Sequence, residues 1–418
     1  MTRYLRVGRG LAWIVRGVPG VARALATYAV ALLQPAGPQG PGAQGVRPRW
    51  LWRLVALLTL LAVGGFLVVA AGLVPIKASA RHWPMTAWLL HFAMRRSVAT
   101  HTLGLQAPPL DDPALVLRGA GHYDTGCSPC HGSPDLGPPA IVQHMTPHPP
   151  HLPAVLPGWE DTELFYLVKH GVKFTGMPAW PAQQRDDEVW AMVAFLRLLP
   201  ALEGSAYRQL VHGNTRTPAA TPPVQDLEAP QTIPPAVTAS CARCHGVDGL
   251  GREHSAFPRL AGQHPAYLEA ALHAYARRAR PSGIMEPIAA ALSHDSMRQL
   301  ALYYSRLAAP QPSLQGSTPA IERGRAIASH GIPRQRVPAC APCHGPGAAP
   351  RQPAYPVLAG QYADYLVLQL ELFQQGQRGG SPYAHLMLPV AARLTPEQRR
   401  DVALYYAALP ALHEQPAP

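Results

Sequence analysis

Acidic residues are missing from the first 110 positions of the chain. All 24 Asp and Glu residues follow that segment, whereas the segment itself carries twelve of the 36 Lys and Arg residues. The formal net charge of +12 therefore belongs to the N-terminal part, and residues 111–418 carry equal numbers of basic and acidic side chains. A neutral main part argues against nucleic-acid binding, because proteins that bind nucleic acid carry clustered positive charge.

Charge of either sign is missing from the apolar run Leu54–Ile76. A run of this length is sufficient to cross a lipid bilayer as a helix. More arginines precede the run than follow it, so the positive-inside rule places the N-terminus in the cytoplasm and everything after Ile76 on the periplasmic side of a bacterial inner membrane. The small residues at Ala78–Ala80 are also typical of a cleaved signal peptide, which remains the alternative to an uncleaved anchor.

Cysteine is scarce, and its spacing argues against disulfides. All six cysteines occur in three C-x-x-C-H motifs with none left over. This spacing is that of c-type haem attachment, in which two thiols bind one porphyrin as thioethers and the next residue, histidine, ligates the iron. Paired C-x-x-C motifs can also build a zinc cage, but such a cage requires no His after each pair. The three predicted haem sites comprise Cys127, Cys130 and His131; Cys241, Cys244 and His245; and Cys340, Cys343 and His344.

A second axial ligand to each iron is predicted from methionines that follow the motifs. Residues 285–307 align without a gap with residues 387–409, which places Met285 and Met387 at equivalent positions, each two residues before a proline. Met297 lies opposite Arg399 in this alignment and is expected to be an ordinary helix residue. A thioether ligand opposite the histidine gives a low-spin haem suited to passing electrons.

The first motif is followed at a similar interval by Met177, in the segment Gly171–Trp180. Met177 is the predicted ligand, and Met145 or a histidine remains an alternative. His170 is expected to end a helix, with Gly171 as its C-terminal stop. Further histidine candidates for this ligand are His144, His148 and His151.

Alternating strand patterns are missing, and apolar residues recur at helical spacing, so the chain is predicted to be all-α. It is expected to contain three haem domains in tandem behind a transmembrane helix, with the first domain as a separate module and the second and third packed as a rigid pair. The predicted division is a basic, amphipathic cytoplasmic leader at 1–49, an anchor at 50–76, a connector at 77–111, domains at 112–203, 237–308 and 320–412, and linkers at 204–236 and 309–319.

These motifs resemble those of the class I c-type cytochromes. The second and third domains, through "LAGQ", "M-x-P-[IV]-A" and "LALYY", are similar to the tandem dihaem cytochromes of that family. The first domain resembles the haem domains of membrane-anchored cytochromes that serve periplasmic dehydrogenases. The second domain departs from the family because Pro-rich sequence stands where its first helix is expected, so its haem is expected to be the more exposed.

The resemblance implies an electron-transfer protein with three covalent haem c groups and no catalytic residues. It would relay single electrons on the periplasmic face from a dehydrogenase or a quinol to an oxidase or a soluble cytochrome. Its partners would be such a redox protein and, through residues 54–76, the lipid bilayer. The alternative is a haem enzyme of the peroxidase kind, which requires one iron without a strong distal ligand.

Overall fold

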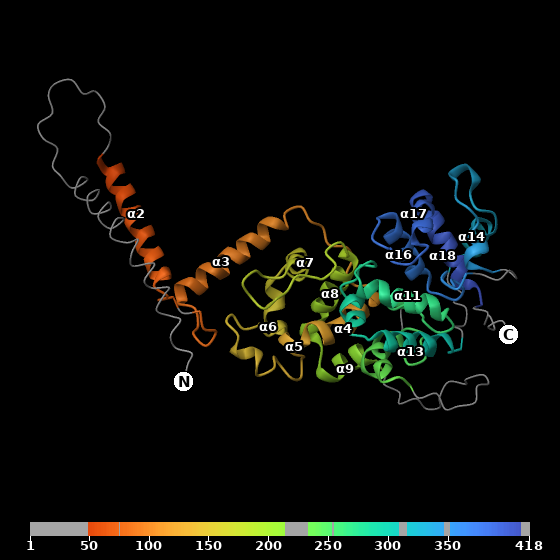
Figure 1. Cartoon of the computed structure of the whole chain (residues 1–418), viewed down its shortest axis with the longest axis horizontal. Helices are drawn as coiled ribbons and strands as arrows, with labels where there is room; N and C mark the ends of the chain where they lie inside the picture. The colour runs from red at the N-terminus through yellow and green to blue at the C-terminus, as the bar shows by residue number, and fades with distance from the viewer. Residues whose placement is uncertain are drawn as a thin grey trace, which may run out of the picture. The chain divides into compact units, whose positions relative to one another are not determined.

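The computed structural model describes residues 49–74, 76–213, 233–252, 255–308, 316–346 and 352–410. Within these residues the protein is helical, without strands apart from one isolated bridge between Ile332 and Val337, which confirms the all-α prediction (Figure 1). Nearly all of the predicted leader, residues 1–48, and residues 214–232 of the predicted linker lie outside the described residues.

The longer helices are connected by short helical turns. The α-helices are α2 (Arg49–Ala70), α3 (Pro84–His101), α4 (Pro113–Gly126), α5 (Ser128–His131), α6 (Leu152–Val155), α7 (Asp161–His170), α8 (Asp186–Leu198), α9 (Gly204–His212), α10 (Ala242–His245), α11 (Pro265–Ala276), α12 (Met285–Ala290), α13 (His294–Ser305), α14 (Thr318–His330), α15 (Ala341–His344), α16 (Ala363–Gln374), α17 (Ala384–Arg393) and α18 (Pro396–Ala408). The short 3₁₀ or π turns are η1 (Val142–His144), η2 (Leu156–Gly158), η3 (Leu199–Ala201), η4 (Val237–Cys241) and η6 (Pro333–Gln335).

The chain divides into two compact units, Met1–Ala80 and Arg81–Pro418. Within the first, α2 supplies a stretch, Trp50–Ala70, with a mean hydropathy of 2.3 and a length that would cross a membrane. The helix ends before the predicted Ile76, and Gly72 follows it with a left-handed φ of 71°. Length and composition thus agree with the predicted anchor.

A helix that the sequence interpretation missed, α3, lies inside the predicted connector. Its C-terminal half packs against α7 and the turn before it. The Arg95 guanidinium lies 4.2 Å from the centre of the Trp159 ring and donates a hydrogen bond to the Gly158 carbonyl (2.9 Å). Its N-terminal half exposes Met85, Trp88, Leu89 and Phe92 at the spacing of one helix face, and this apolar stripe is the sequence signal that could have predicted the helix.

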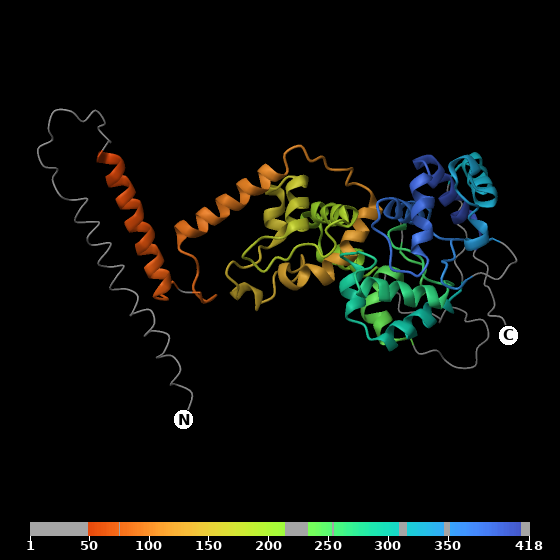
Figure 2. The same cartoon turned by 45° about the horizontal axis from the view of Figure 1, so that its top comes forward.

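The first and third predicted domains share one helix crossing. In the first, α4 crosses α8 at Gly119, where an added Cβ would lie 2.2 Å from the Ala191 carbonyl oxygen. In the third, α14 crosses α18 at Gly324, where a Cβ would lie 2.1 Å from the Asp401 carbonyl oxygen. In each case glycine is required because the two backbones touch. Figures 1 and 2 show α4 beside α8 and α14 beside α18.

The second domain begins differently in the residues described before its motif. The short turn η4 (Val237–Cys241) stands there in place of a long helix, and α4 of the first domain packs against the motif helix α10. A Cβ added to Gly121 of α4 would lie 3.0 Å from the Cys244 sulfur. Cys244 and His245 are each only 9% exposed, more buried than their counterparts in the other motifs. The motif residues of the second domain are therefore covered, because α4 of the first domain takes the place of the missing helix; the exposure of the haem itself stays a prediction.

The same contacts correct the expectation that the first domain is a separate module. Arg243 of α10 forms an ion pair with Asp124 of α4 (2.9 Å), and Arg118 of α4 donates a hydrogen bond to the Ala256 carbonyl (3.3 Å). Part of the predicted linker forms α9, whose C-terminal carbonyls, including those of Leu210 and Val211, accept hydrogen bonds from Arg252. The first and second domains are packed together.

Two local predictions, those for Gly171 and Met297, are confirmed, and further local features accompany them. Thr395 and Gln398 form a capping box at the start of α18. Gly171 ends α7 with a φ of 64°. Met297 is buried in α13 as an ordinary helix residue. The paired tyrosines are also buried; they are Tyr303, Tyr304, Tyr405 and Tyr406.

Candidate haem sites

The three C-x-x-C-H motifs adopt one local structure. Each ends in a single helical turn, α5, α10 or α15, and the glycine after the histidine has a left-handed φ of 74°, 77° or 78°. These glycines are Gly132, Gly246 and Gly345. Because glycine reaches this conformation without strain, the chain can turn away directly after the histidine and leave the imidazole side open to a ligand.

Each motif histidine makes the same hydrogen bond. The Nδ1 atoms of His131, His245 and His344 lie 3.0 Å from the carbonyl oxygens of Pro150, Pro258 and Pro356, respectively. A carbonyl accepts only, so Nδ1 carries the proton and Nε2 retains the lone pair that binds iron. Burial lowers the pKa of His131 and of His245, which favours the neutral imidazole that a metal requires.

A buried tyrosine supports the glycine of each motif. Tyr304 donates to the Gly246 carbonyl (3.2 Å) and Tyr406 to the Gly345 carbonyl (2.7 Å), and both tyrosines come from the closing helix of their domain. In the first domain the donor is Tyr123 of the opening helix α4, 2.9 Å from the Gly132 carbonyl. The same hydrogen bond is thus made by the closing helix in the second and third domains and by the opening helix in the first.

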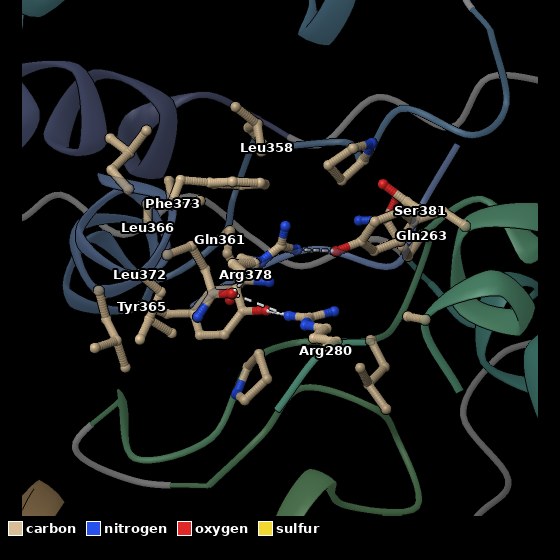
Figure 3. A pocket seen from close by; sticks show the side chains of 18 of the residues that line it. Gln263, Arg280, Leu358, Gln361, Tyr365, Leu366, Leu372, Phe373, Arg378 and Ser381 are labelled. Atoms are coloured by element: carbon tan, nitrogen blue, oxygen red, sulfur yellow. Dashed lines mark hydrogen bonds between the residues drawn. The ribbon is translucent and has the colours of Figure 1, made fainter. Parts of the chain in front are cut away.

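The second and third sites open into one shared cavity of about 550 Å³. The cavity walls include both complete motifs, together with the predicted distal ligands Met285 of α12 and Met387 of α17. Figure 3 shows its apolar wall, which includes Leu358, Leu366 and Phe373. A porphyrin requires apolar walls, two cysteines, a histidine with a free Nε2 and a thioether, and the residues at each of these two sites fit that requirement.

The first site has two methionines in one neighbourhood. Met177 lies at the end of a tight turn, in which its carbonyl accepts from the Val172 amide (3.2 Å) and its amide donates to Thr175 Oγ1 (3.1 Å). A Cβ added to Gly176 would lie 2.3 Å from the terminal methyl of Met145. The candidate histidines His144, His148, His151 and His170 are exposed. The two methionines are therefore neighbours and partly buried, whereas the four histidines are exposed.

The thiols are not arranged as a zinc cage. In the described parts of the chain, no three His, Cys, Asp or Glu side chains gather closely enough to hold a metal ion. Burial raises the pKa of the first thiol of each motif, to about 12 for Cys127 and to about 11 for Cys241 and Cys340. Zinc binds thiolates, whereas thioether attachment removes the thiol proton permanently, so these buried positions suit haem attachment.

Two glutamines that join the second and third domains were not predicted. Gln263 donates to the Val357 carbonyl (3.0 Å) and accepts from the Val357 amide (2.8 Å) of the third domain. Gln361 makes the reciprocal pair with Arg259 of the second domain, at 3.0 and 3.1 Å. Both belong to the repeated "LAGQ" segment, and both appear in Figure 3. The signal was a polar side chain repeated in an otherwise apolar loop.

Comparison with known proteins agrees with this geometry. Residues 114–196 match the family described as cytochrome c oxidase, cbb3-type, subunit III, and residues 235–304 match the cytochrome c family. The thiosulfate dehydrogenase electron acceptor of Thiomonas intermedia is 38% identical over 179 residues, which cover 42% of this chain and 81% of that protein. The chain belongs to the cytochrome c family.

Within that family the chain is similar to dihaem carriers. A cytochrome c4 from Thiocapsa roseopersicina is 35% identical over 46% of this chain and 96% of its own length. A solved cytochrome c4 structure from Acidithiobacillus ferrooxidans is 36% identical over 40% of this chain and 98% of that chain, with a TM-score of 0.36. Like its relatives, the chain is an electron-transfer protein with covalently bound haem c.

Proposed function

We propose that the chain carries three haem c groups in three domains and relays single electrons among them. The observation that carries this proposal is the threefold repetition of the motif with its histidine Nδ1 bonded to a proline carbonyl at 3.0 Å. The domains span residues 112–203, 237–308 and 320–412, joined by residues 204–236 and 309–319.

Each haem has two attaching cysteines and two axial ligands in this proposal. The attaching residues are Cys127 and Cys130, Cys241 and Cys244, and Cys340 and Cys343; the axial pairs are His131 with Met177, His245 with Met285, and His344 with Met387. Bound in this way, haem supplies one-electron chemistry between ferric and ferrous iron. The chain's own part is to fix the imidazole orientation, to exclude water with apolar walls and to hold the sites close together.

The membrane placement rests on α2 and on the charge asymmetry around it. The helix is long and apolar enough to span a bilayer, and the segment before it holds arginines and no acidic residue. We infer an inner-membrane anchor with the N-terminus in the cytoplasm and the three haem domains in the periplasm. The relay would then work at the periplasmic surface of that membrane.

The electron donor that we favour is a periplasmic dehydrogenase, with an oxidase or a soluble cytochrome as acceptor. The support is that two relatives, each 38% identical to this chain, are named thiosulfate dehydrogenase electron acceptors. A thiosulfate dehydrogenase is therefore the first donor to test, with a quinol as the second. The rate of haem reduction is measured with each of the two donors under the same conditions. The donor that reduces the haems rapidly is the physiological one.

Haem content is the direct test of the three-site proposal. Iron and pyridine haemochrome measured on the purified full chain should give three haems per chain. Replacing both cysteines of one motif with alanine should lower the ratio to two. A ratio of two in the unmodified chain would contradict the proposal.

The distal ligand of the first haem has its own test. Ferric haem with a methionine ligand shows a weak near-infrared band, and Met177→Ala should remove one haem's share of it. Met145→Ala is the matched control, since the Met145 methyl lies beside Gly176. Loss of one haem's share of the band in Met145→Ala, with the band unchanged in Met177→Ala, would move the ligand to Met145.

A further inference from the structure

The N-terminal half of α3 presents an apolar stripe that no other described part of the chain covers. The side chains of Met85, Trp88, Leu89 and Phe92 are 80%, 64%, 55% and 50% exposed, respectively. Residues three and four positions apart share one face of a helix, so the four side chains lie together, and the centres of the Trp88 and Phe92 rings are 5.5 Å apart. A contiguous exposed apolar patch marks a binding site for a protein or a membrane.

The C-terminal half of the same helix is fixed to the first predicted domain. The side chains of Val98 and Thr102 are buried, and the His101 ring stacks on the Tyr166 ring of α7, with 5.5 Å between their centres. Arg95 adds its hydrogen bond and its ring contact to the turn before α7. Because one continuous helix carries both halves, whatever binds the stripe also orients the first domain.

Positive charge accompanies the stripe. Arg96 is exposed and follows Phe92 by four residues, so it extends the same face of the helix, and the exposed Arg81 precedes the helix. The chain has no acidic residue before Asp111 to offset these cations. A surface that suits α3 therefore combines an apolar interior with negative groups at its edge. A bilayer that contains anionic phospholipids has both properties.

The position of α3 in the chain also favours a membrane over a soluble partner. Only residues 71–83 connect the end of α2 with the start of α3, and a fully extended chain of this length spans about 45 Å at most. If α2 spans the bilayer, α3 is held beside that membrane at all times. Among the described helices only α2 is long and apolar enough to cross, so α3 lies along the surface and does not form a second span.

We propose that the N-terminal half of α3 lies in the periplasmic surface of the bilayer, with the stripe among the acyl chains and Arg81 and Arg96 at anionic phospholipid headgroups. This inference rests on the proposed function, because it requires α2 as the membrane anchor. Trp88 and the exposed Trp83 suit this depth, since an indole ring is apolar and its N–H is polar. The helix thereby holds the first domain at one orientation to the membrane.

The test is oxidative footprinting of the full holoprotein in nanodiscs of phosphatidylcholine and phosphatidylglycerol. Hydroxyl radicals oxidise methionine and tryptophan side chains that water reaches, and mass spectrometry gives the oxidation rates of Met85 and Trp88. Leu89→Glu places a carboxylate within the stripe and should raise both rates several-fold, because a charged group leaves the acyl chains for water. Ala87→Glu is the matched control, since Ala87 is exposed on the other side of the helix; both rates should stay low.

Equal oxidation rates in the unmodified chain and in Leu89→Glu would overturn the proposal, since the stripe would then not be held by lipid. Slow oxidation that appears only in nanodiscs with two protein copies would also overturn it, because a second copy of the chain would then cover the stripe. Both variants should keep the haem content of the unmodified chain. Release of the unmodified chain from membranes by alkaline carbonate would contradict the proposed anchor instead, and this extraction separates that failure from this one.

Discussion

The two interfaces between the proposed haem domains are built in different ways. Between the second and third domains, equivalent residues exchange equivalent contacts, as Gln263 and Gln361 do with Val357 and Arg259. Between the first and second domains the contacts are one-sided, and they centre on Glu188 of α8. Its carboxylate accepts from Ser282 Oγ (2.6 Å) and from the Gly283 amide (2.6 Å), both in the loop that leads to Met285.

This difference shows which interface contacts an internal repeat can supply and which it cannot. A duplicated domain brings a self-complementary surface with it, as in an isologous dimer, so one set of residues serves both sides. The first domain has no such copy, and it replaces the symmetric contact with buried charge and with α4 laid over the second motif. We therefore expect the one-sided interface to be more sensitive to single substitutions and to pH.

Glu188→Ala should have the largest effect. The substitution leaves Ser282, Gly283 and the Trp180 indole without their shared acceptor and leaves Arg185 without one of its carboxylates. Loss of one member of a buried charged network costs about 3–5 kcal/mol. Guanidinium titration of the holoprotein, followed at the Soret band, should show this loss together with weakening of the Met285 near-infrared band.

Glu322→Ala is the control for that substitution. Glu322 is exposed on α14 and pairs only within its own helix, with Arg325, among the described residues. The free energy of unfolding of this variant should stay within about 0.5 kcal/mol of that of the unmodified protein. Equal effects from the two substitutions would remove the contrast between the interfaces.

The second prediction concerns pH. His122 of α4 is buried against Trp180, and burial, with a smaller effect from Arg243, lowers the pKa of His122 to about 4. The unfolded chain takes up this proton near pH 6.5, whereas the folded chain does not until about pH 4. Stability should therefore be full above pH 6.5 and fall as the pH drops toward 4, by about 2 kcal/mol at pH 5.

Thermal unfolding of the full chain between pH 5 and 8 measures this loss. His122→Gln should flatten the slope between pH 5 and 6.5 even if it lowers stability at every pH. His330→Gln, at an exposed position in the third domain, should retain the slope. A slope that survives the His122 substitution would assign the pH sensitivity to another group.

Most residues of the candidate sites could be predicted from the sequence, because the chemistry of haem attachment requires particular residue types at a short, fixed spacing. The motifs and the alignment of Met285 with Met387 needed no tertiary information. The role of α4 over the second motif was missed, since burial by a neighbouring domain leaves no trace in the covered segment. Arg280 and Arg378, two buried arginines that line the cavity shared by the second and third sites, were missed for a similar reason. A buried arginine and an exposed one look alike in a sequence, and only the fold brings Arg280 and Arg378 together.

Gln361→Ala tests the symmetric interface. It removes two hydrogen bonds to the Arg259 backbone and should cost about 1–2 kcal/mol. Gln263→Ala is the matched variant, and symmetry predicts that its cost equals that of Gln361→Ala within about 0.5 kcal/mol. Guanidinium titration provides both values. A large inequality would show that the two domains do not contribute equally.

The smallest effect is expected at the edge of the one-sided interface, from Arg243→Gln. Its ion pair with Asp124 is partly open to solvent, with the side chains 14% and 25% exposed. Asp124 would still accept from the Tyr207 hydroxyl (3.2 Å), so no carboxylate is left without a partner. We expect a cost of about 0.5–1 kcal/mol that shrinks as salt is added, because solvent ions partly screen a pair that is partly open to solvent. Guanidinium cannot be the denaturant here, since it is itself a salt, and urea titrations at low and high sodium chloride measure the difference. A cost near that of Glu188→Ala, insensitive to salt, would mean that the whole interface behaves as one buried charged network and that its edge is not distinct from its centre.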